Sequence, residues 1–237
     1  SPTSGCSPVV VVFSDQSTGN PTSWQWNFGN GNNSSSQNPS AIYYNPGTYT
    51  VTLTVSNASS SDTETKTAYI TVFEDPKASF TVSDTAGCDP FPVTFTDQST
   101  PGDAAITNYV WDFGDGGIST ATNPSHTYTS KGSKTVSLVV TDANGCSADT
   151  TVPGLIKVGE YPDVDFSTGN IFSCSPPITV SFNNSTTGYN LSSYNWDFGN
   201  GFYSSVQFPS HTYNNVGSYP VTFSATSNHG CIASITK

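Results

Sequence analysis

The stretch Tyr109-Val110-Trp111-Asp112-Phe113-Gly114-Asp115-Gly116 decides the fold, and close copies of it begin at Trp24 and at Tyr194. Successive side chains of a strand point to opposite faces, so Trp111 and Phe113 share one face. The Gly-Asp-Gly that follows tolerates positive φ, and the chain is expected to reverse there. A large aromatic ring in the middle of a strand is typical of the core of a two-sheet sandwich.

The repeat divides the chain of 237 residues into three units of similar length. The central tryptophan recurs at Trp26, Trp111 and Trp196, and such a period indicates small tandem domains. We expect domains at residues 1–74, 75–160 and 161–237. The first is expected to lack its first strand and the third to have a truncated last strand, because only the second unit carries both segments in full.

Composition argues against two classes of partner. The net charge is −11, and all six basic residues are lysine. A chain without arginine lacks the forked donor that reads phosphate and base edges, and its acidic field repels a polyanion. No apolar run approaches the roughly 18 residues that span a bilayer. The sequence therefore predicts neither nucleic-acid binding nor membrane insertion.

Each unit shows the same series of strand and turn signals. A Val-x-Phe pair precedes the tryptophan strand, an Asn-Pro or Phe-Pro step follows it, and a glycine then leads into the longest alternating strand. There is no helical periodicity. These patterns predict an all-β fold of three tandem immunoglobulin-like sandwiches arranged end to end. The expected core signature is Trp26, Trp111, Trp196, Tyr43, Tyr128 and Tyr213.

A family resemblance rests on motifs that recur together at fixed spacing. The run from Trp111 to Gly116, followed by Asn-Pro-Ser-His-Thr-Tyr at residues 123–128 and by the strand at residues 135–145, resembles the PKD (polycystic kidney disease) domain. The likeness covers the chain as three repeats. It implies an extracellular seven-strand sandwich that serves as a spacer or interaction module. The Gly-Cys pairs make the units similar to repeats in long surface proteins and adhesins of Bacteroidetes-type bacteria.

The sequence predicts no catalytic residues. His126 and His211 occupy the position that Ala41 holds in the first unit, which favours a structural role for the imidazole. No Ser/His/Asp or Cys/His set recurs, and no paired carboxylates fall on one face of one strand. We therefore expect the chain not to be an enzyme and to need no cofactor.

Acidic turn residues offer a competing interpretation. Asp97, Asp112 and Asp115 of the second unit are weak candidates for a Ca²⁺ site, because Ca²⁺ accepts oxygen ligands in loose geometry. The alternative is that these side chains bond the backbone of their own turns. The first unit has Asn27 and Asn30 at two of the positions, which favours that alternative.

Two further surface roles are suggested by residue type. Thr85 and Thr150 each follow an aspartate, in sequences that resemble O-glycosylation acceptors of Bacteroidetes-like hosts. Four aromatic residues outside the expected core are candidates for stacking on a sugar ring: Tyr44, Tyr161, Phe202 and Tyr203.

The cysteines indicate an oxidising compartment, since their repeated Gly-Cys pattern lacks metal-ligand spacing. Three of them precede the Val-x-Phe strand and two follow the last long strand. The early ones are Cys6, Cys88 and Cys174, and the late ones are Cys146 and Cys231. In the first unit, Ser61 takes the late position.

Two pairings of these cysteines are open. Pairing within units would join Cys88 to Cys146 and Cys174 to Cys231. In an immunoglobulin-like topology these positions lie at opposite ends of a sandwich, about 20 Å apart, whereas a disulfide needs Cα atoms within about 7 Å. Bridges between consecutive units, Cys6–Cys146 and Cys88–Cys231, fit the topology better. Such bridges would leave Cys174 for a following unit.

The sequence favours a structural spacer or stalk segment of a long extracellular, cell-surface fibre or adhesin. Bridged units with short proline-containing linkers, at residues 73–77 and 158–162, would form a stiff row. The expected partners are further repeats of the same chain, and lateral association with other copies or with surface glycans is also considered. The alternative function is a calcium- or polysaccharide-binding accessory module of a secreted enzyme or adhesin.

Overall fold

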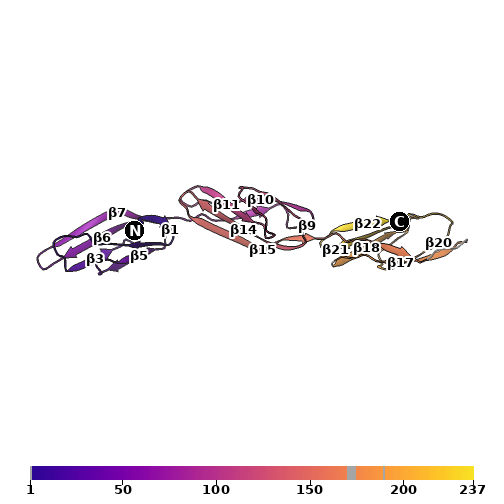
Figure 1. The fold of residues 1–237 in the computed structure, drawn as a ribbon, viewed down its shortest axis with the longest axis horizontal. Coiled ribbons are helices and arrows are strands. Elements are labelled where there is room, and N and C mark those ends of the chain that lie inside the picture. The colour runs from indigo at the N-terminus through magenta and orange to yellow at the C-terminus, as the bar shows by residue number, and fades with distance from the viewer. Residues whose placement is uncertain (1, 170–174, 189) are drawn as a thin grey trace.

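The computed structural model describes residues 2–169, 175–188 and 190–237, and every regular element in this part of the chain is a β-strand. Figure 1 shows three sandwiches one after another along the long axis of the molecule. The predicted all-β fold of tandem immunoglobulin-like units arranged end to end is therefore confirmed. In the same described ranges, no helix is long and apolar enough to cross a membrane.

The second unit has two complete sheets. Its strands are β8 (Phe80–Val82), β9 (Ala86–Cys88), β10 (Phe91–Asp97), β11 (Ile106–Asp112), β12 (Ile118–Ser119), β13 (Ser125–Tyr128), β14 (Gly132–Asp142) and β15 (Ser147–Gly159). One sheet has the order β13-β10-β8, and the other has the order β12-β11-β14-β15-β9. Neighbouring strands are antiparallel except β9 and β15, which run parallel.

The first unit follows the same plan with one difference. Its strands are β1 (Ser4–Cys6), β2 (Val9–Val12), β3 (Ser23–Asn27), β4 (Asn33–Ser34), β5 (Ser40–Tyr43), β6 (Gly47–Ser56) and β7 (Ser61–Phe73). They form the sheets β2-β5 and β1-β7-β6-β3-β4. In the first unit the Val-x-Phe pair is Val11 and Phe13, and strand β2 ends at Val12, before Phe13. Strand β10 instead continues to Asp97, because its second half pairs with β8. The described part of the first unit contains no counterpart of β8.

The third unit ends its last sheet with a short strand. Its strands are β16 (Phe166–Thr168), β17 (Ile178–Asn184), β18 (Leu191–Asp197), β19 (Tyr203–Ser204), β20 (Ser210–Tyr213), β21 (Thr222–Ser227) and β22 (Ile232–Thr236). The sheets are β16-β17-β20 and β19-β18-β21-β22. Strand β22 corresponds to the first part of β15, which is much longer.

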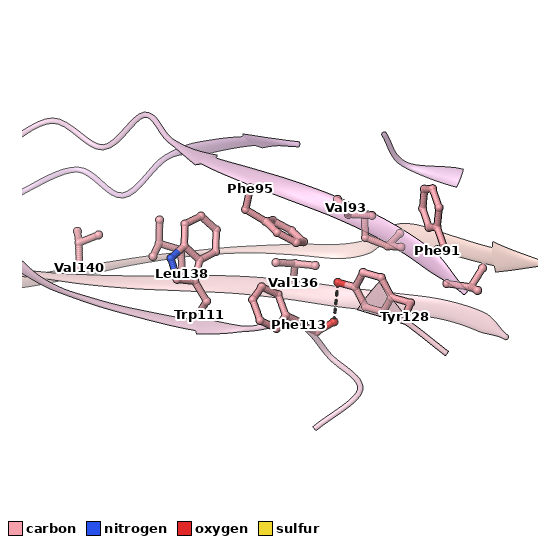
Figure 2. Packing of buried hydrophobic residues seen from close by; sticks show 11 residues of the cluster. Phe91, Val93, Phe95, Trp111, Phe113, Tyr128, Val136, Leu138 and Val140 are labelled. Atoms are coloured by element: carbon pink, nitrogen blue, oxygen red, sulfur yellow. Dashed lines mark hydrogen bonds between the residues drawn. The ribbon is translucent and has the colours of Figure 1, made fainter. Parts of the chain in front are cut away.

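Alternation along the strands builds the core of each unit. Val93 and Phe95 of β10 face Trp111 and Leu138 from the opposite sheet, and all four side chains are buried (Figure 2). The residues between them along the strands point outward, as period-two patterning requires. Equivalent clusters lie in the first and third units, so each unit has a core of its own.

The core signature residues are held by hydrogen bonds as well as by packing. The Trp111 indole Nε1–H donates to the carbonyl oxygen of Ala121 at 2.9 Å. The Tyr128 hydroxyl donates to the carbonyl oxygen of Phe113 at 3.1 Å, the dashed line in Figure 2. The same bonds recur in the other units, where the donors are Trp26, Trp196, Tyr43 and Tyr213. Each aromatic residue therefore buries its ring without leaving its polar atom unpaired.

The turn after the tryptophan strand requires glycine for two reasons. Gly114 has φ +77°, a conformation that L side chains rarely adopt. A Cβ atom there would also lie only 2.1 Å from the carbonyl oxygen of Thr135. The glycine thus lets the turn lie directly against the start of β14, which explains its place in the repeated motif.

Candidate functional site

Cys6 and Cys88 sit at the end of their units where the chain leaves for the next one. Cys6 ends β1 and pairs with Phe73 at the end of β7, and Cys88 ends β9 and pairs with Gly159 at the end of β15. The Asp89 N–H donates to the Gly159 carbonyl oxygen at 3.1 Å, which ties the two ends together. The short strands β1 and β9 therefore fix Cys6 and Cys88 beside the linkers.

The late cysteines follow a tight turn at the opposite end of a unit. Asp142 Oδ1 accepts hydrogen bonds from the backbone N–H groups of Asn144 and Cys146, at 2.9 and 2.8 Å. In the third unit, Ser227 Oγ accepts from the Cys231 N–H at 3.2 Å. The glycine before each late cysteine has positive φ, +85° at Gly145 and +81° at Gly230. This requirement explains the Gly-Cys pairs at the late positions.

The structure joins early and late cysteines of consecutive units. Cys6 is bonded to Cys146 with a Cα–Cα distance of 5.3 Å, and Cys88 is bonded to Cys231 with a Cα–Cα distance of 5.6 Å. These are the bridges between units that the topology favours. The alternative pairs Cys88–Cys146 and Cys174–Cys231 are not formed, because Cys146 and Cys231 already have other partners. Cys174 itself lies outside the described residues.

The linkers are also held by backbone hydrogen bonds. Lys77 and Thr100 exchange two N–H···O bonds of 2.8 and 2.9 Å, and Asp163 and Thr187 exchange two bonds of 2.9 Å in the second linker. The linker prolines Pro76 and Pro162 are both buried. Each linker therefore lies on the unit that follows it, which restricts bending at the junction.

The two junctions differ in how their backbones pack. In the first linker, the Glu74 N–H donates to Asp103 Oδ2 at 2.8 Å. At the second junction, Gly159 is buried, and a Cβ atom there would lie 2.5 Å from the Cβ of His229 and 2.9 Å from the Cys231 sulfur. Phe73 holds the position of Gly159 in the first unit. The second junction therefore needs the glycine, whereas the first accommodates a large side chain.

The aspartates considered as calcium ligands accept hydrogen bonds from the backbone of their own turns. Asp97 Oδ1 accepts from the Ser99 N–H, and Asp112 Oδ1 accepts from the Gly114 N–H, at 2.9 and 2.8 Å. Across the described residues, the one group of three or more His, Cys, Asp or Glu ligand atoms within 4.8 Å is Cys6, Asp75 and Cys146. Its two sulfur atoms are bonded to each other. The structure does not bring Asp97, Asp112 and Asp115 into such a group, and calcium binding stays a prediction.

Asp115 has a second partner in the expected structural histidine. Its Oδ1 accepts from the Gly117 N–H at 3.0 Å, and its Oδ2 lies 2.8 Å from His126 Nε2. Partial burial tends to raise the pKa of Asp115, but the bonds from His126 and Gly117 outweigh burial and hold the pKa below its ordinary value. His126 stacks on Phe113 with ring centroids 4.2 Å apart. The pair therefore braces the turn against the core.

The third unit builds the equivalent contact without a carboxylate. His211 stacks on Phe198 at 4.3 Å, and its Nε2 lies 3.0 Å from Asn200 Nδ2. Burial lowers the pKa of His211, and no acidic partner opposes that shift. The same packing role is thus served by a histidine–carboxylate contact in one unit and by a histidine–amide contact in the other.

The other predicted surface residues lie on different parts of the molecule. Thr85 is exposed, and Thr150 is half-buried on β15. The four sugar-stacking candidates all have exposed side chains: Tyr44, Tyr161, Phe202 and Tyr203. Of these, Phe202 and Tyr203 are neighbours on the third unit, whereas Tyr44 belongs to the first.

Two grooves open into the cores of the outer units. The groove of the first unit has a volume of about 650 Å³ and is lined by Phe13, Trp26 and Leu53, among others. In the second unit this region holds Phe80, whose ring centroid lies 5.2 Å from that of Trp111. The groove of the third unit, also about 650 Å³, is lined by Phe166, Val180 and Tyr213, among others.

Sequence reasoning missed two recurring features of the structure. The strands β1 and β9 were not expected, because each has three residues and its partner lies far along the chain. The tyrosine and tryptophan hydrogen bonds were not expected either. The sequence did carry a signal for these bonds, because the donor residue and the acceptor residue are separated by the same number of positions in every unit.

Three β-sandwiches that are joined through their ends by disulfides define a tandem array of small modules. The family model for the PKD domain matches residues 3–72, 74–154 and 160–237. The chain belongs to the PKD domain family, as the sequence motifs predicted.

Known relatives share single units with this chain. A stretch of 60 residues is 47% identical to "Microbial collagenase" of Vibrio alginolyticus, covering 25% of this chain and 7% of that protein. A stretch of 68 residues is 46% identical to "Collagenase ColQ1" of Bacillus cereus (strain Q1), covering 29% of this chain and 7% of that protein. The chain therefore spans a small part of the collagenases that it matches.

One solved PKD structure is similar to part of this chain. The PKD1 domain of Vibrio anguillarum Epp is 35% identical, with a TM-score of 0.33. The match covers 36% of this chain and 98% of that domain.

Proposed function

We propose that this chain is a stiff spacer segment of a secreted or surface-anchored protein, built as part of a stalk, fibre or adhesin. The observation that supports this role most directly is the disulfide across each of the two junctions. Backbone hydrogen bonds and a buried proline at each linker add to it. PKD domains are non-catalytic modules, and the proposal assigns no reaction to the chain.

The same features support a proposed location and proposed partners for the spacer. Disulfides persist in oxidising compartments, so the proposed location is outside the cell. The proposed partners are further PKD repeats before or after these units, and other copies or surface glycans along the sides. The collagenase relatives are consistent with a module that accompanies other domains in a longer protein.

Small-angle X-ray scattering of the oxidised chain tests the spacer role. Three units of about 40 Å each should give a maximum dimension of about 120 Å with a narrow distribution. The matched control replaces Cys6 and Cys146 by serine, which removes only the first bridge. Serine is a suitable replacement at the late position because Ser61 holds that position naturally. A wild-type distribution as broad as that of the control would argue against a stiff spacer.

Polysaccharide binding is a second candidate function, favoured by two neighbouring aromatic residues. Phe202 and Tyr203 are 62% and 67% exposed on the third unit, and exposed rings of this kind stack on sugars. A glycan array with the wild type and a variant carrying Phe202→Ala and Tyr203→Ala tests this role. Binding that is lost in the variant would support it. A calcium titration of the same proteins tests the metal-binding alternative.

A further inference from the structure

The two disulfides overlap along the sequence. Cys88 lies inside the loop that Cys6–Cys146 closes, and Cys146 lies inside the loop that Cys88–Cys231 closes. The four cysteines therefore form two covalent crossing points. We call them the first node (Cys6 with Cys146) and the second node (Cys88 with Cys231).

Three stretches of chain connect these nodes in parallel. They are residues 6–88, 88–146 and 146–231. The first stretch carries β2 to β9, the second carries β10 to β14, and the third carries β15 to β21. Only residues 1–5 and 232–237 lie outside the nodes. A force between the two ends of the chain enters at one node and leaves at the other, so the three stretches are loaded in parallel.

The shortest stretch sets the greatest separation of the nodes. The stretch from Cys88 to Cys146 has roughly 60 residues, and the other two have roughly 80 each, at about 3.4 Å per extended residue. The nodes therefore cannot move more than about 200 Å apart, however far the units unfold. With both tails extended, the whole chain reaches about 240 Å, against about 800 Å for the same chain without bridges.

In the folded state, one strand already spans the distance between the nodes. Cys146 directly precedes β15, and Gly159 at the other end of β15 pairs with Cys88. A strand is close to its full extension, so it cannot lengthen under load. Further extension requires β15 to slide along the parallel strand β9, which breaks the bonds around Lys157 and Asp89 together. The folded array thus resists stretching before the covalent limit is reached.

We propose that the overlapping disulfides give this segment a further function, as a tether of limited length. Even when all three units are unfolded, the two ends stay within about a third of the distance that the unbridged chain allows. The biological meaning of this limit rests on the proposed spacer role, because a spacer between domains is where load would pass along the chain. The limit itself depends only on which cysteines are bonded.

Single-molecule stretching between handles at the two termini tests the tether. All proteins carry Cys174→Ser so that a fifth cysteine cannot exchange with the bridges. The oxidised protein should show a final contour length of about 240 Å. Under thiol reductant the same protein should reach about 800 Å. A final length of about 600 Å without reductant would show a single Cys88–Cys146 bridge and would overturn the proposal.

Two single-bridge variants give matched controls. Cys6→Ser leaves only the second node and Cys88→Ser leaves only the first, and both should stop at about 320 Å. Their agreement would confirm that each node contributes separately. Variants that do not fold would fail to form the remaining bridge and would reach about 800 Å, so the reductant experiment on the four-cysteine protein decides the matter.

The tether and the spacer can fail separately. A contour of about 240 Å together with a broad scattering distribution would keep the tether and remove the stiff spacer. A narrow distribution at about 120 Å together with a contour of about 800 Å under oxidising conditions would keep the spacer and remove the tether.

Discussion

The second and third units share a plan but close their cores differently at one end. In the second unit, β15 continues to Gly159 and places Ile156 and Val158 in the core, where both are fully buried. In the third unit, the corresponding strand β22 ends at Thr236, and a groove lies where those side chains would be. The second half of the last strand therefore serves two purposes, since it covers the core and reaches the next junction.

The start of the neighbouring strand depends on the same segment. In the second unit, Gly132 and Ser133 at the start of β14 pair with residues of β15. In the third unit, β21 begins only at Thr222, and Gly217 and Tyr219 line the groove instead of pairing. Without a counterpart of the second half of β15 beside them, the residues just before Thr222 thus do not form a regular strand. The comparison shows that these two strand segments form together.

Replacing the central tryptophan should have the largest effect in this comparison. Trp111→Ala and Trp196→Ala each remove a fully buried ring, and each should lower the free energy of unfolding of its unit by about 3–5 kcal/mol. The loss should be smaller for Trp196→Ala, because Phe166 and Phe182 contact Trp196 and also line the groove, so they have room to move. Denaturant unfolding followed by hydrogen exchange in each unit measures both values.

An exposed aromatic residue gives the control for these variants. Tyr203→Ala should change the free energy of unfolding by less than about 0.5 kcal/mol. An equal or greater loss for Trp196→Ala than for Trp111→Ala would contradict the idea that the groove lets the third core adjust.

Adding a counterpart of the second half of β15 to the third unit should have an effect of intermediate size on the stability of that unit. A chain extended after Lys237 by a copy of residues 153–160 places an isoleucine and a valine over the groove. A second extension with serine at those two positions has the same length and the same backbone entropy. The apolar extension should stabilise the third unit by about 2–5 kcal/mol relative to the serine extension, because burial of each of the two side chains contributes about 1.5–3 kcal/mol and a compact unfolded chain reduces the sum by roughly 10–40%.

Hydrogen exchange of the strand that starts at Thr222 reads out this prediction locally. The amides of Gly217, Ser218 and Tyr219 should become protected with the apolar extension and stay unprotected with the serine one. Equal stability of the two extended chains would mean that the groove does not accept the strand.

Lowering the pH should destabilise the third unit more than the second, and this difference in stability should be the smallest of the predicted effects. The pKa of His211 is lowered in the folded unit, so the unfolded state binds a proton more readily and stability falls as the pH drops below about 6.5. The pKa of Asp115 is also lowered, but a carboxyl group contributes its stability above its unfolded pKa, near 3.8, and loses it only below that pH. Between pH 6.5 and 4.5 the third unit should therefore weaken first, by less than about 1 kcal/mol.

Unit-resolved unfolding at pH 7 and pH 5 measures this difference. His211→Ala is the matched control, because alanine holds the same position in the first unit as Ala41. The variant should lose the pH dependence of the third unit. Persistence of that dependence in the variant would assign it to another group.

The sequence predicted those parts of the fold that depend on local pattern. The tryptophan strand, the glycine turn and the alternating Val136, Leu138 and Val140 follow from period-two burial and from positive φ, and all are present. Strand ends were less predictable. Phe13 lies outside β2, because the length of that strand depends on a partner strand elsewhere in the chain.

The candidate sites could not be predicted from residue types alone. An aspartate in a turn, such as Asp112, can bind a cation or its own backbone, and only the positions of neighbouring oxygens separate the two uses. The cysteine pairing likewise depends on how the end of one unit approaches the next. The repeat pattern left two pairings and topology favoured the bridges between units, which the relative placement of the units in the structure shows.

The crossed bridges also bear on how the molecule is degraded. A protease that cuts one exposed loop between Cys6 and Cys231 leaves the two ends joined through the remaining two stretches. The halves separate only after at least one cut in each of the three stretches. A nicked molecule should therefore run as one band on a non-reducing gel and as fragments after reduction.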